Sequence, residues 1–448
     1  MPRPANAPLP QPVFGEPVFS EGVPTPDPTT FKVTPTDDGL YNGIQDLLTK
    51  DVVGFAQSRV TPHDMFELQT AWGSHGAEVI QQIEAAEQIV FHAVGDSGAS
   101  ASRNLPGELK VSDLLTDDLN SSKPDNRPAF LYHLGDLVYN FGESAYYYDQ
   151  FYEPFRDYGA PIFAIPGNHD SFVVPNTPAG SEPLTIFSRN FCATTTVVTQ
   201  EAGSLHRTAM MQPGVYFTLD APFVRIIGLF SNSLEDPGVI SSENGKWAAV
   251  PDLQLDFLTA QLNRIKTEKY AGAVILAVHH PPFSYAAKPV KPAPVGASGT
   301  HVGNSVMLGQ IDTICKAQGV YPHAFLSAHA HNYQRYTRKV AFNGKNCTVP
   351  FVVCGDGGHN VNPVVEAKRG QPAPAVGDNI DVSYLDPSPV VKAGGLTLNK
   401  HDQSNYGYLR ITVDAKQLTI EFHPVNPRAT AALPVDSVTV NLANHTAK

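Results

Sequence analysis

The stretch Gly135-Asp136-Leu137-Val138-Tyr139-Asn140 follows the apolar run Ala129–Leu134, and the rest of the chain repeats its plan. A short apolar run that ends abruptly in Gly-Asp is typical of a buried strand that delivers a carboxylate to a loop. In open α/β folds, ligands bind outside the carboxyl ends of the strands. The loop that begins at Gly135 is therefore a candidate site for chemistry.

Four further stretches consist of an apolar run followed at once by residues that can bind metals. They are Ile89–Val94 before Gly95-Asp96-Ser97-Gly98, Pro161–Ile165 before Pro166-Gly167-Asn168-His169-Asp170, Ala273–Val278 before His279-His280-Pro281-Pro282, and Ala324–Ser327 before Ala328-His329-Ala330-His331. One such loop carries little information, but five with metal-ligand chemistry point to a single site. The candidate ligands in these loops are Asp96, Asp136, Tyr139, Asn168, His279, His329 and His331.

Seven candidate ligands are too many for one ion. They suit two ions about 3.5–4 Å apart that share a carboxylate, an arrangement that clamps the attacking and leaving oxygens in phosphoryl transfer. Ordinary interpretations stay open for single residues. Either aspartate alone can be a helix cap or a turn residue. Tyr139 can pack against Phe141, and His169 can be a buried structural histidine.

Composition excludes several classes of partner. The 448 residues are 42% hydrophobic and 17% charged, as expected of a globular protein with a large core. The net charge of −12 disfavours a nucleic acid, whose binding depends on Lys and Arg neutralising phosphates. Small anionic substrates remain compatible with a metal site.

No apolar run is long enough for a membrane span, and four cysteines are too few for a disulfide scaffold. The sequence does not indicate an oligomeric state.

The pattern of the chain predicts one main domain with extensions. We expect a Pro-rich extended N-terminal arm over residues 1–40, a helical segment over 41–88 that packs on the main domain, the main domain over 89–430, and a C-terminal tail over 431–448. Within the main domain, helices are expected over 144–157, 252–266 and 306–317, and hairpins over 214–229 and 339–353. Strands alternate with helices early and follow one another late. This order predicts an α/β fold of two packed mixed β-sheets flanked by helices.

The five loops in this order resemble the binuclear metallophosphoesterases and, more narrowly, the purple acid phosphatases. The resemblance covers about residues 89–360 and implies an αββα sandwich. The narrower likeness depends on two positions. Gly98 stands where most metallophosphoesterases have a histidine ligand, and Tyr139 stands where purple acid phosphatases have a ligating phenolate. A phenolate oxygen suits Fe(III), whereas imidazole suits softer divalent ions. Ala328 departs from the glycine usual at that position.

Carried over by position, the resemblance implies two metal sites. The first would be formed by Asp96, Asp136, Tyr139 and His331. The second would share Asp136 and add Asn168, His279 and His329. The cofactors implied are Fe(III) and a divalent ion, which can be Zn, Fe or Mn. The resemblance also favours a secreted or periplasmic location, although no basic-then-apolar leader is visible.

The reaction implied is acid phosphatase activity, in which a metal-bound hydroxide hydrolyses the phosphate monoester of a small phosphorylated substrate. The leaving alkoxide needs a proton, and histidine is the natural donor. Our candidates for this donor, in order, are His169, His301 and His280. His359 lies at a further strand end and could border the site. Two rivals are a phosphodiesterase on the same scaffold and a non-catalytic binding protein of this fold, which would be expected to lack some of the seven ligands.

Overall fold

The structure is a computed structural model. It describes residues 13–20, 31, 38–49, 65–171, 184–203, 205–235, 237–284, 305–362, 364, 395–426 and 433–448. His301 therefore lies outside the described residues.

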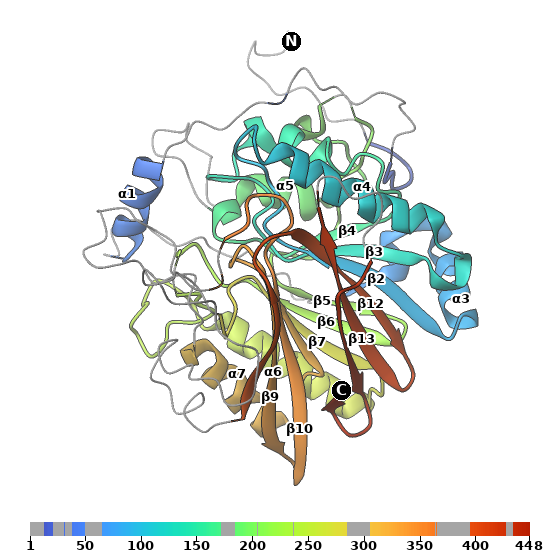
Figure 1. The fold of residues 1–448 in the computed structure, drawn as a ribbon, viewed down its shortest axis with the longest axis vertical. Coiled ribbons are helices and arrows are strands. Elements are labelled where there is room, and N and C mark those ends of the chain that lie inside the picture. The colour runs from blue at the N-terminus through green and yellow to red at the C-terminus, as the bar shows by residue number, and fades with distance from the viewer. Residues whose placement is uncertain are drawn as a thin grey trace, which may run out of the picture.

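Two mixed β-sheets form the centre of the molecule (Figure 1). The eight-stranded sheet has, in order, β1 (Met65–Glu67), β5 (Phe217–Ala221), β6 (Val224–Leu229), β7 (Ala273–Val278), β8 (Ala324–Ser327), β10 (Lys345–Cys354), β9 (Tyr333–Phe342) and β11 (Leu396–Asp402). The seven-stranded sheet has β15 (Thr446–Ala447), β14 (Asp436–Asn441), β13 (Gln417–Val425), β12 (Tyr406–Asp414), β2 (Gln88–Val94), β3 (Pro128–His133) and β4 (Ile162–Ala164).

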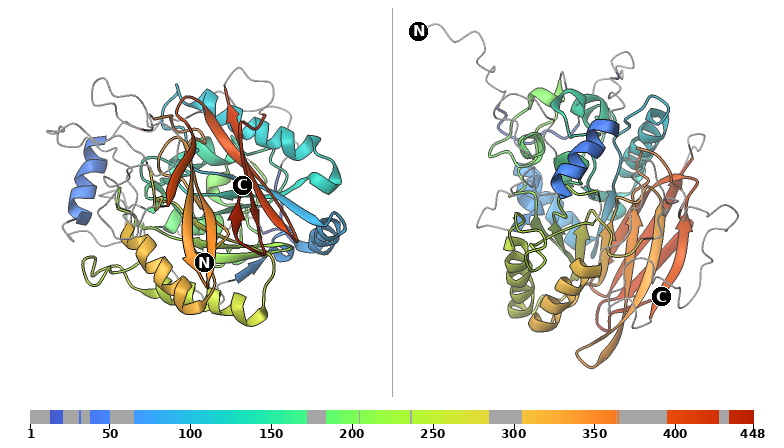
Figure 2. Two further views of the ribbon diagram at one scale, coloured as in Figure 1. Left: turned by 60° about the horizontal axis from the view of Figure 1, so that its bottom comes forward. Right: turned by 90° about the vertical axis from the view of Figure 1, so that its left-hand side faces the viewer.

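Helices cover both sheets. The helices are α1 (Asp38–Thr49), α2 (Leu68–Ala71), α3 (Gly76–Ala85), α4 (Leu105–Ser121), α5 (Thr185–Phe191), α6 (Leu253–Glu268) and α7 (Ser305–Gln318). α4 packs on β12 and β13, and α6 packs on β6 beside α7. Figure 2 shows α6 and α7 together on one side of the strands. The predicted architecture of two packed mixed sheets flanked by helices is confirmed.

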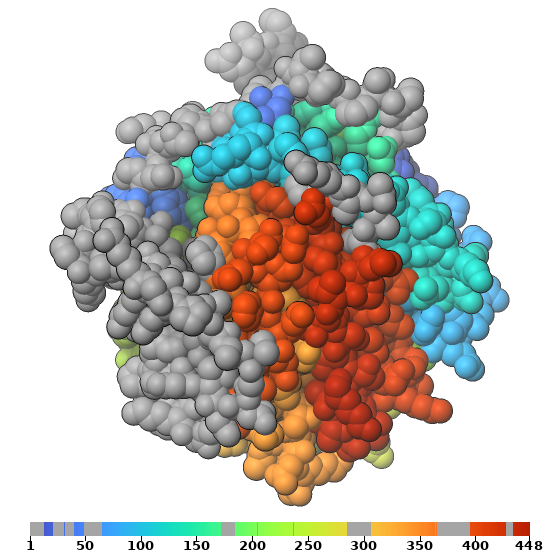
Figure 3. Space-filling model, viewed as in Figure 1, coloured from blue at the N-terminus to red at the C-terminus, as the bar shows by residue number. Residues whose placement is uncertain are grey.

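Each sheet combines a parallel part with antiparallel strands. In the seven-stranded sheet β2, β3 and β4 run parallel, and in the other sheet β6, β7 and β8 do. These strands are almost entirely buried, as expected for parallel strands covered on both faces. The C-terminal strands are antiparallel hairpins, and their residues (orange to red) form much of the face seen in Figure 3.

Several local predictions need correction. The aromatic segment 144–157 is not one helix, because it holds a 3₁₀ turn (Ser144–Tyr146) and a π-helical turn (Tyr148–Tyr152). Four of its aromatic side chains nevertheless lie in the main core, and Tyr146 and Tyr148 pack against it. The segment 41–88 also contains β1, which pairs parallel with β5. Residues 436–447 form β14 and β15, which extend the seven-stranded sheet. The predicted hairpins β5–β6 and β9–β10 are confirmed.

No helix in the described part of the chain is long and apolar enough to cross a membrane. All four cysteines have free thiols.

Candidate metal centre

The five predicted strand ends belong to two sheets, and backbone hydrogen bonds join their loops. The Asp96 amide, in the loop after β2, donates to Gly135 O, in the loop after β3, at 2.9 Å. The Ala328 amide, in the loop after β8, donates to His279 O, in the loop after β7, also at 2.9 Å. Asp96, Asp136 and His329 have positive φ angles of 55°, 56° and 66°. Positive φ is uncommon for residues other than glycine, and such conformations are concentrated at functional sites.

Three of the predicted residues surround the hydroxyl of a fourth, Tyr139, and we refer to Asp96, Asp136, Tyr139 and His331 as the tyrosine cluster. The Tyr139 hydroxyl lies 3.0 Å from Asp96 Oδ1, 3.2 Å from Asp136 Oδ2 and 3.5 Å from His331 Nε2. His331 Nε2 is 3.3 Å from Asp96 Oδ1. Tyr139 is fully buried, and because its hydroxyl makes these contacts it does more than pack against Phe141.

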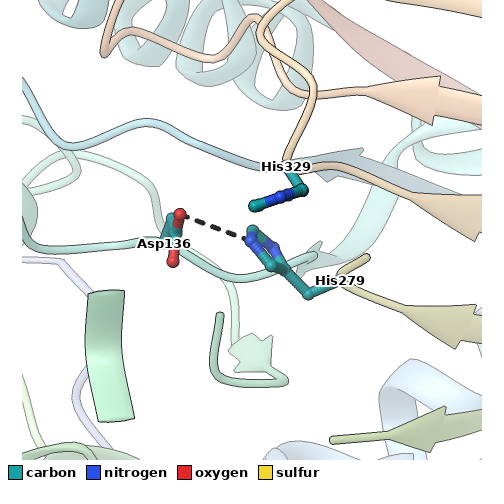
Figure 4. Close-up of side chains that lie close together, drawn as sticks. All are labelled: Asp136, His279 and His329. Carbon is teal, nitrogen blue, oxygen red and sulfur yellow. Dashed lines mark ion pairs between the residues drawn. The ribbon is translucent and has the colours of Figure 1, made fainter. Parts of the chain in front are cut away.

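The other predicted residues form a second group with Asp136, and we refer to Asp136, Asn168, His279 and His329 as the histidine cluster. His279 Nε2 lies 3.1 Å from Asn168 Oδ1 and 3.3 Å from Asp136 Oδ2. Figure 4 shows Asp136, His279 and His329 converging from three separate loops. Each of these three offers one ligand atom, and the atoms all lie within 4.8 Å of one another, so the group could hold a metal ion.

The two clusters share one carboxylate oxygen. Asp136 Oδ2 is the atom that contacts both the Tyr139 hydroxyl and His279 Nε2. Burial alone would raise the pKa of Asp136, but the charges of His279 and His169 hold it below its usual range. Burial likewise would lower the pKa of His279, but the Asp136 charge raises it to about 9. The protonated His279 ring and the Asp136 carboxylate thus stabilise each other, and a bound metal ion would take the place of the His279 proton.

The ring nitrogens that face away from the clusters are held by protein oxygens. His279 Nδ1 donates to Leu134 O at 2.8 Å, and His331 Nδ1 lies 2.5 Å from Asn360 Oδ1. Each contact directs the Nε2 atom of its histidine toward the clusters. Partners of this kind are usual for metal-binding histidines. Carboxylate, amide, phenol and imidazole donors fit the predicted set of one hard and one softer ion.

Asp170 has a role that the sequence analysis missed, although it ends the motif Gly167-Asn168-His169-Asp170. Its carboxylate accepts hydrogen bonds from the backbone amides of Asp136, Leu137, Val138 and Gly167, at 2.7–3.2 Å. It thereby joins the loop after β3 to the loop after β4. Burial, followed by the nearby Asp136 charge, raises the pKa of Asp170 to about 7.

His169 borders both clusters and is partly exposed. Its backbone amide donates to Asp136 Oδ1 at 2.9 Å, and its Nδ1 donates to Asn140 O at 2.8 Å. Nε2 is therefore the nitrogen that could carry a transferable proton.

His280 has a different environment, which argues against a role as proton donor. Its Nδ1 accepts from the Ser231 hydroxyl at 2.7 Å, and its Nε2 donates to Leu234 O at 2.8 Å. Burial lowers its pKa to about 3, so the ring is neutral. Both ring nitrogens of His280 are thus engaged by other protein groups.

The structure gives a steric reason for glycine at position 98. A Cβ atom there would lie 2.4 Å from Leu137 O and 2.6 Å from Gln150 Oε1. Gln150 in turn accepts from the Tyr139 amide at 2.9 Å and so holds the loop that carries the tyrosine. His359 lies against the same region, with its ring stacked on Tyr139 at 3.6 Å and its Nδ1 3.0 Å from Gly98 O.

Comparisons with known proteins bear on this arrangement. The family model of the calcineurin-like phosphoesterases matches residues 90–333. No curated protein sequence matches the chain.

Solved structures with a similar fold include purple acid phosphatase PPD1 from yellow lupin seeds, which has 15% sequence identity and a TM-score of 0.45 over 79% of this chain. GAP50, the anchor in the inner membrane complex of Plasmodium, has 12% identity and a TM-score of 0.46, and the match covers 78% of this chain and 89% of that one. PhoD has 12% identity and a TM-score of 0.46, and the match covers 81% of this chain and 71% of that one. The match spans 54%, about half, of the lupin chain.

The family model spans more than half of the chain and includes all five strand ends that form the two clusters. The predicted resemblance to the metallophosphoesterases is thereby confirmed, and the chain belongs to the calcineurin-like phosphoesterase family.

Proposed function

We propose that the protein is a phosphoric monoester hydrolase of the purple acid phosphatase type. The observation that carries the proposal is the tyrosine cluster. Its phenol oxygen lies within 3.5 Å of two carboxylates and one imidazole, while the position of the usual histidine admits no side chain. This set of donors is richer in hard oxygen ligands than an imidazole-based site and suits Fe(III).

In this proposal the tyrosine cluster holds Fe(III), and the histidine cluster holds a divalent ion, Zn, Fe or Mn. Asp136 belongs to both. When bound, the pair of ions would supply a water of lowered pKa and would offset charge that develops on the phosphoryl group.

The chain's own residues orient the ligands and supply the proton. Leu134 O and Asn360 hold the rings of His279 and His331. His169 is proposed to protonate the leaving oxygen, because it is next to Asn168 and partly exposed. A general acid of this kind typically contributes about 10²–10⁴-fold to the rate.

The proposal is tested by comparing a nitrophenyl phosphate monoester with the corresponding bis-ester, from acid to mildly alkaline pH. We expect the monoester to be preferred and its hydrolysis to be faster in acid than at neutral pH. A preference for the diester would favour a phosphodiesterase on the same scaffold. No activity on either ester, with both metals bound, would favour a binding protein.

A further inference from the structure

The helix α1 lies outside the matched family region of residues 90–333 yet reaches the candidate metal centre. Figure 1 shows α1 at the edge of the molecule, apart from the helices that cover the sheets. It packs there in a small apolar cluster of its own, which contains Tyr41, Ile44, Leu48, Phe141, Leu234, Val239 and Val250. Tyr41 is 5% exposed, and its side chain extends from this cluster to Asn168.

The Tyr41 hydroxyl connects a carboxylate to the amide of Asn168. Asn168 Nδ2 lies 2.8 Å from the Tyr41 oxygen, and the Tyr41 hydroxyl donates to Glu235 Oε2. Asn168 Nδ2 is also 3.3 Å from Glu235 Oε2. An ionised carboxylate can only accept hydrogen bonds. The hydroxyl must therefore donate to Glu235 and accept from Asn168, which requires the NH₂ group of Asn168 to face Tyr41.

This order of donors fixes which end of the Asn168 amide faces the histidine cluster. With Nδ2 held by Tyr41, the oxygen Oδ1 lies on the other side, 3.1 Å from His279 Nε2. An amide binds a metal through its oxygen, and a flipped amide would present NH₂ in its place. A phenol hydroxyl can donate one hydrogen bond and accept others, so the Tyr41 oxygen can serve both partners at once.

The same ring contacts the proposed proton donor. Tyr41 is stacked on His169, with ring centroids 4.6 Å apart and an interplanar angle of 12°. Gln45, one turn further along α1, donates to Ser233 O and accepts from the Glu235 amide, both at 2.9 Å. The helix is thus anchored to the loop that carries Glu235, on the side of the histidine cluster.

We propose that Tyr41 is a positioning residue of the divalent-ion site, which orients the Asn168 amide through its hydroxyl and supports His169 through its ring. The inference rests on the proposed function, since it takes Asn168 as a ligand of the divalent ion. It adds to that function a residue from a segment before the family domain.

The test uses the full chain and the variant Tyr41→Phe, which keeps the stacked ring and removes only the hydroxyl. Protein loaded with iron is titrated with Zn²⁺, and the dissociation constant of the zinc ion is measured. Loss of a group that orients a ligand typically weakens metal binding by about 10–100-fold. We expect a loss of this size, partial recovery of activity at high Zn²⁺, and an unchanged iron–tyrosinate absorption band, because the Tyr41 hydroxyl contacts Asn168 and Glu235, which lie outside the tyrosine cluster.

The matched control is Ile44→Val, which removes one methylene from the same helix without touching the hydroxyl. It is expected to reduce thermal stability slightly and to keep the zinc dissociation constant of the wild type. Should Tyr41→Phe fold poorly, Glu235→Ala removes the acceptor of the same hydroxyl and should weaken zinc binding selectively as well.

The outcomes separate the inference from the proposed function. Wild-type protein that binds no second ion would contradict the proposed function. Wild-type protein that binds it, together with an unchanged zinc dissociation constant in Tyr41→Phe, would overturn the inference alone. Equal losses in Tyr41→Phe and Ile44→Val would also overturn it, because they would show only that the helix must dock.

Discussion

At the scale of single residues, the candidate centre depends on polar groups whose remaining atoms are held by the protein. Asp170 collects four backbone amides, and Asn360 and Leu134 O hold two imidazole rings. These contacts leave the side chains of the two clusters with few alternative orientations. Preorganisation of this kind is what a metal site requires, since the ligands then need little rearrangement to bind.

His169 is predicted to be the proton donor, and its effect should depend on the leaving group. Aryl phosphates leave as weakly basic phenoxides, whereas alkyl phosphates leave as strongly basic alkoxides that need a proton. His169→Ala should therefore slow alkyl ester hydrolysis by about 10²–10⁴-fold and aryl ester hydrolysis clearly less. Steady-state kinetics with both esters, at matched metal content, measures the difference. Equal losses for the two esters would assign His169 to phosphate binding instead.

Gly98 is predicted to be sterically required. Gly98→His would place the usual family ligand at this position, but its Cβ would lie 2.4 Å from Leu137 O, a backbone atom. Overpacking of this kind destabilises proteins by about 1–3 kcal/mol. We expect a loss of at least this size in chemical denaturation and no additional bound ion. The control Gly43→Ala has open space around the new Cβ and should be neutral or stabilising. A stable Gly98→His variant would show that the loop adapts.

The sequence was sufficient to predict the site residues that directly follow apolar runs. It was not sufficient to predict the residues that reach the site from other segments of the chain. Asp96 and His279 follow strands whose apolar pattern is visible, so their positions could be inferred. Asn360 and Tyr41 have no such signal, because their roles depend on loops that meet only in the folded chain. The position of His280 directly after an apolar run does not show that its surroundings differ from those of the adjacent His279.

At the scale of elements, the predicted strands β2, β3, β4, β7 and β8 are all present, since their apolar runs are bounded by glycine, proline or histidine loops. The short β1 was missed because three residues give no usable period. The segment 144–157 was misread as one helix because aromatic residues dominate its apolar pattern. Burial of these aromatic rings in the core stabilises turns that have no regular helical period.

Two contacts of the Asp118 carboxylate join three elements and give a prediction at this scale. Asp118 of α4 lies 2.8 Å from His92 Nε2 of β2 and 2.9 Å from Arg410 Nε of β12. Burial would raise the pKa of Asp118, but His92 and Arg410 outweigh it and hold the pKa below its usual range. Asp118→Asn is expected to lower the free energy of unfolding by about 1–3 kcal/mol near neutral pH.

The pH dependence of this loss follows from the direction of the shift. A carboxylate whose pKa is depressed in the folded state stabilises the fold at pH values above its unfolded pKa of about 3.9. This contribution to the free energy of unfolding is lost as the pH falls. The difference in the free energy of unfolding between wild type and Asp118→Asn should therefore become smaller below about pH 4. Urea unfolding at several pH values measures it. A difference that stays constant into acid would mean that the charge of Asp118 is unimportant.

At the scale of the whole molecule, loops that follow strands of two separate sheets meet, and both clusters lie there. The order of strands along the chain was sufficient to predict two sheets. The partner of each strand was not predictable, because pairing between distant segments such as β12 and β2 leaves no local signal. The contribution of α1 to the site was not predictable for the same reason.

Removal of metal should change the stability of the whole fold in a pH-dependent manner. In metal-free protein the His279 pKa is raised to about 9, so its ion pair with Asp136 stabilises fully below about pH 6.5 and is lost as the pH rises through 9. Metal binding requires the neutral ring, so affinity should rise over the same range. We expect the gain in thermal stability on adding Zn²⁺ to increase from about pH 6.5 to 9. A gain that falls over this range would contradict the assignment of His279 as a ligand.

The central claim is that Tyr139 binds iron in a two-metal centre, and metal analysis combined with a visible absorption spectrum tests it most directly. The account predicts two ions per chain, at least one of them iron, and a tyrosinate-to-Fe(III) charge-transfer band that is absent in Tyr139→Phe. Iron-loaded protein without colour, or a band that persists unchanged in Tyr139→Phe, would contradict the claim.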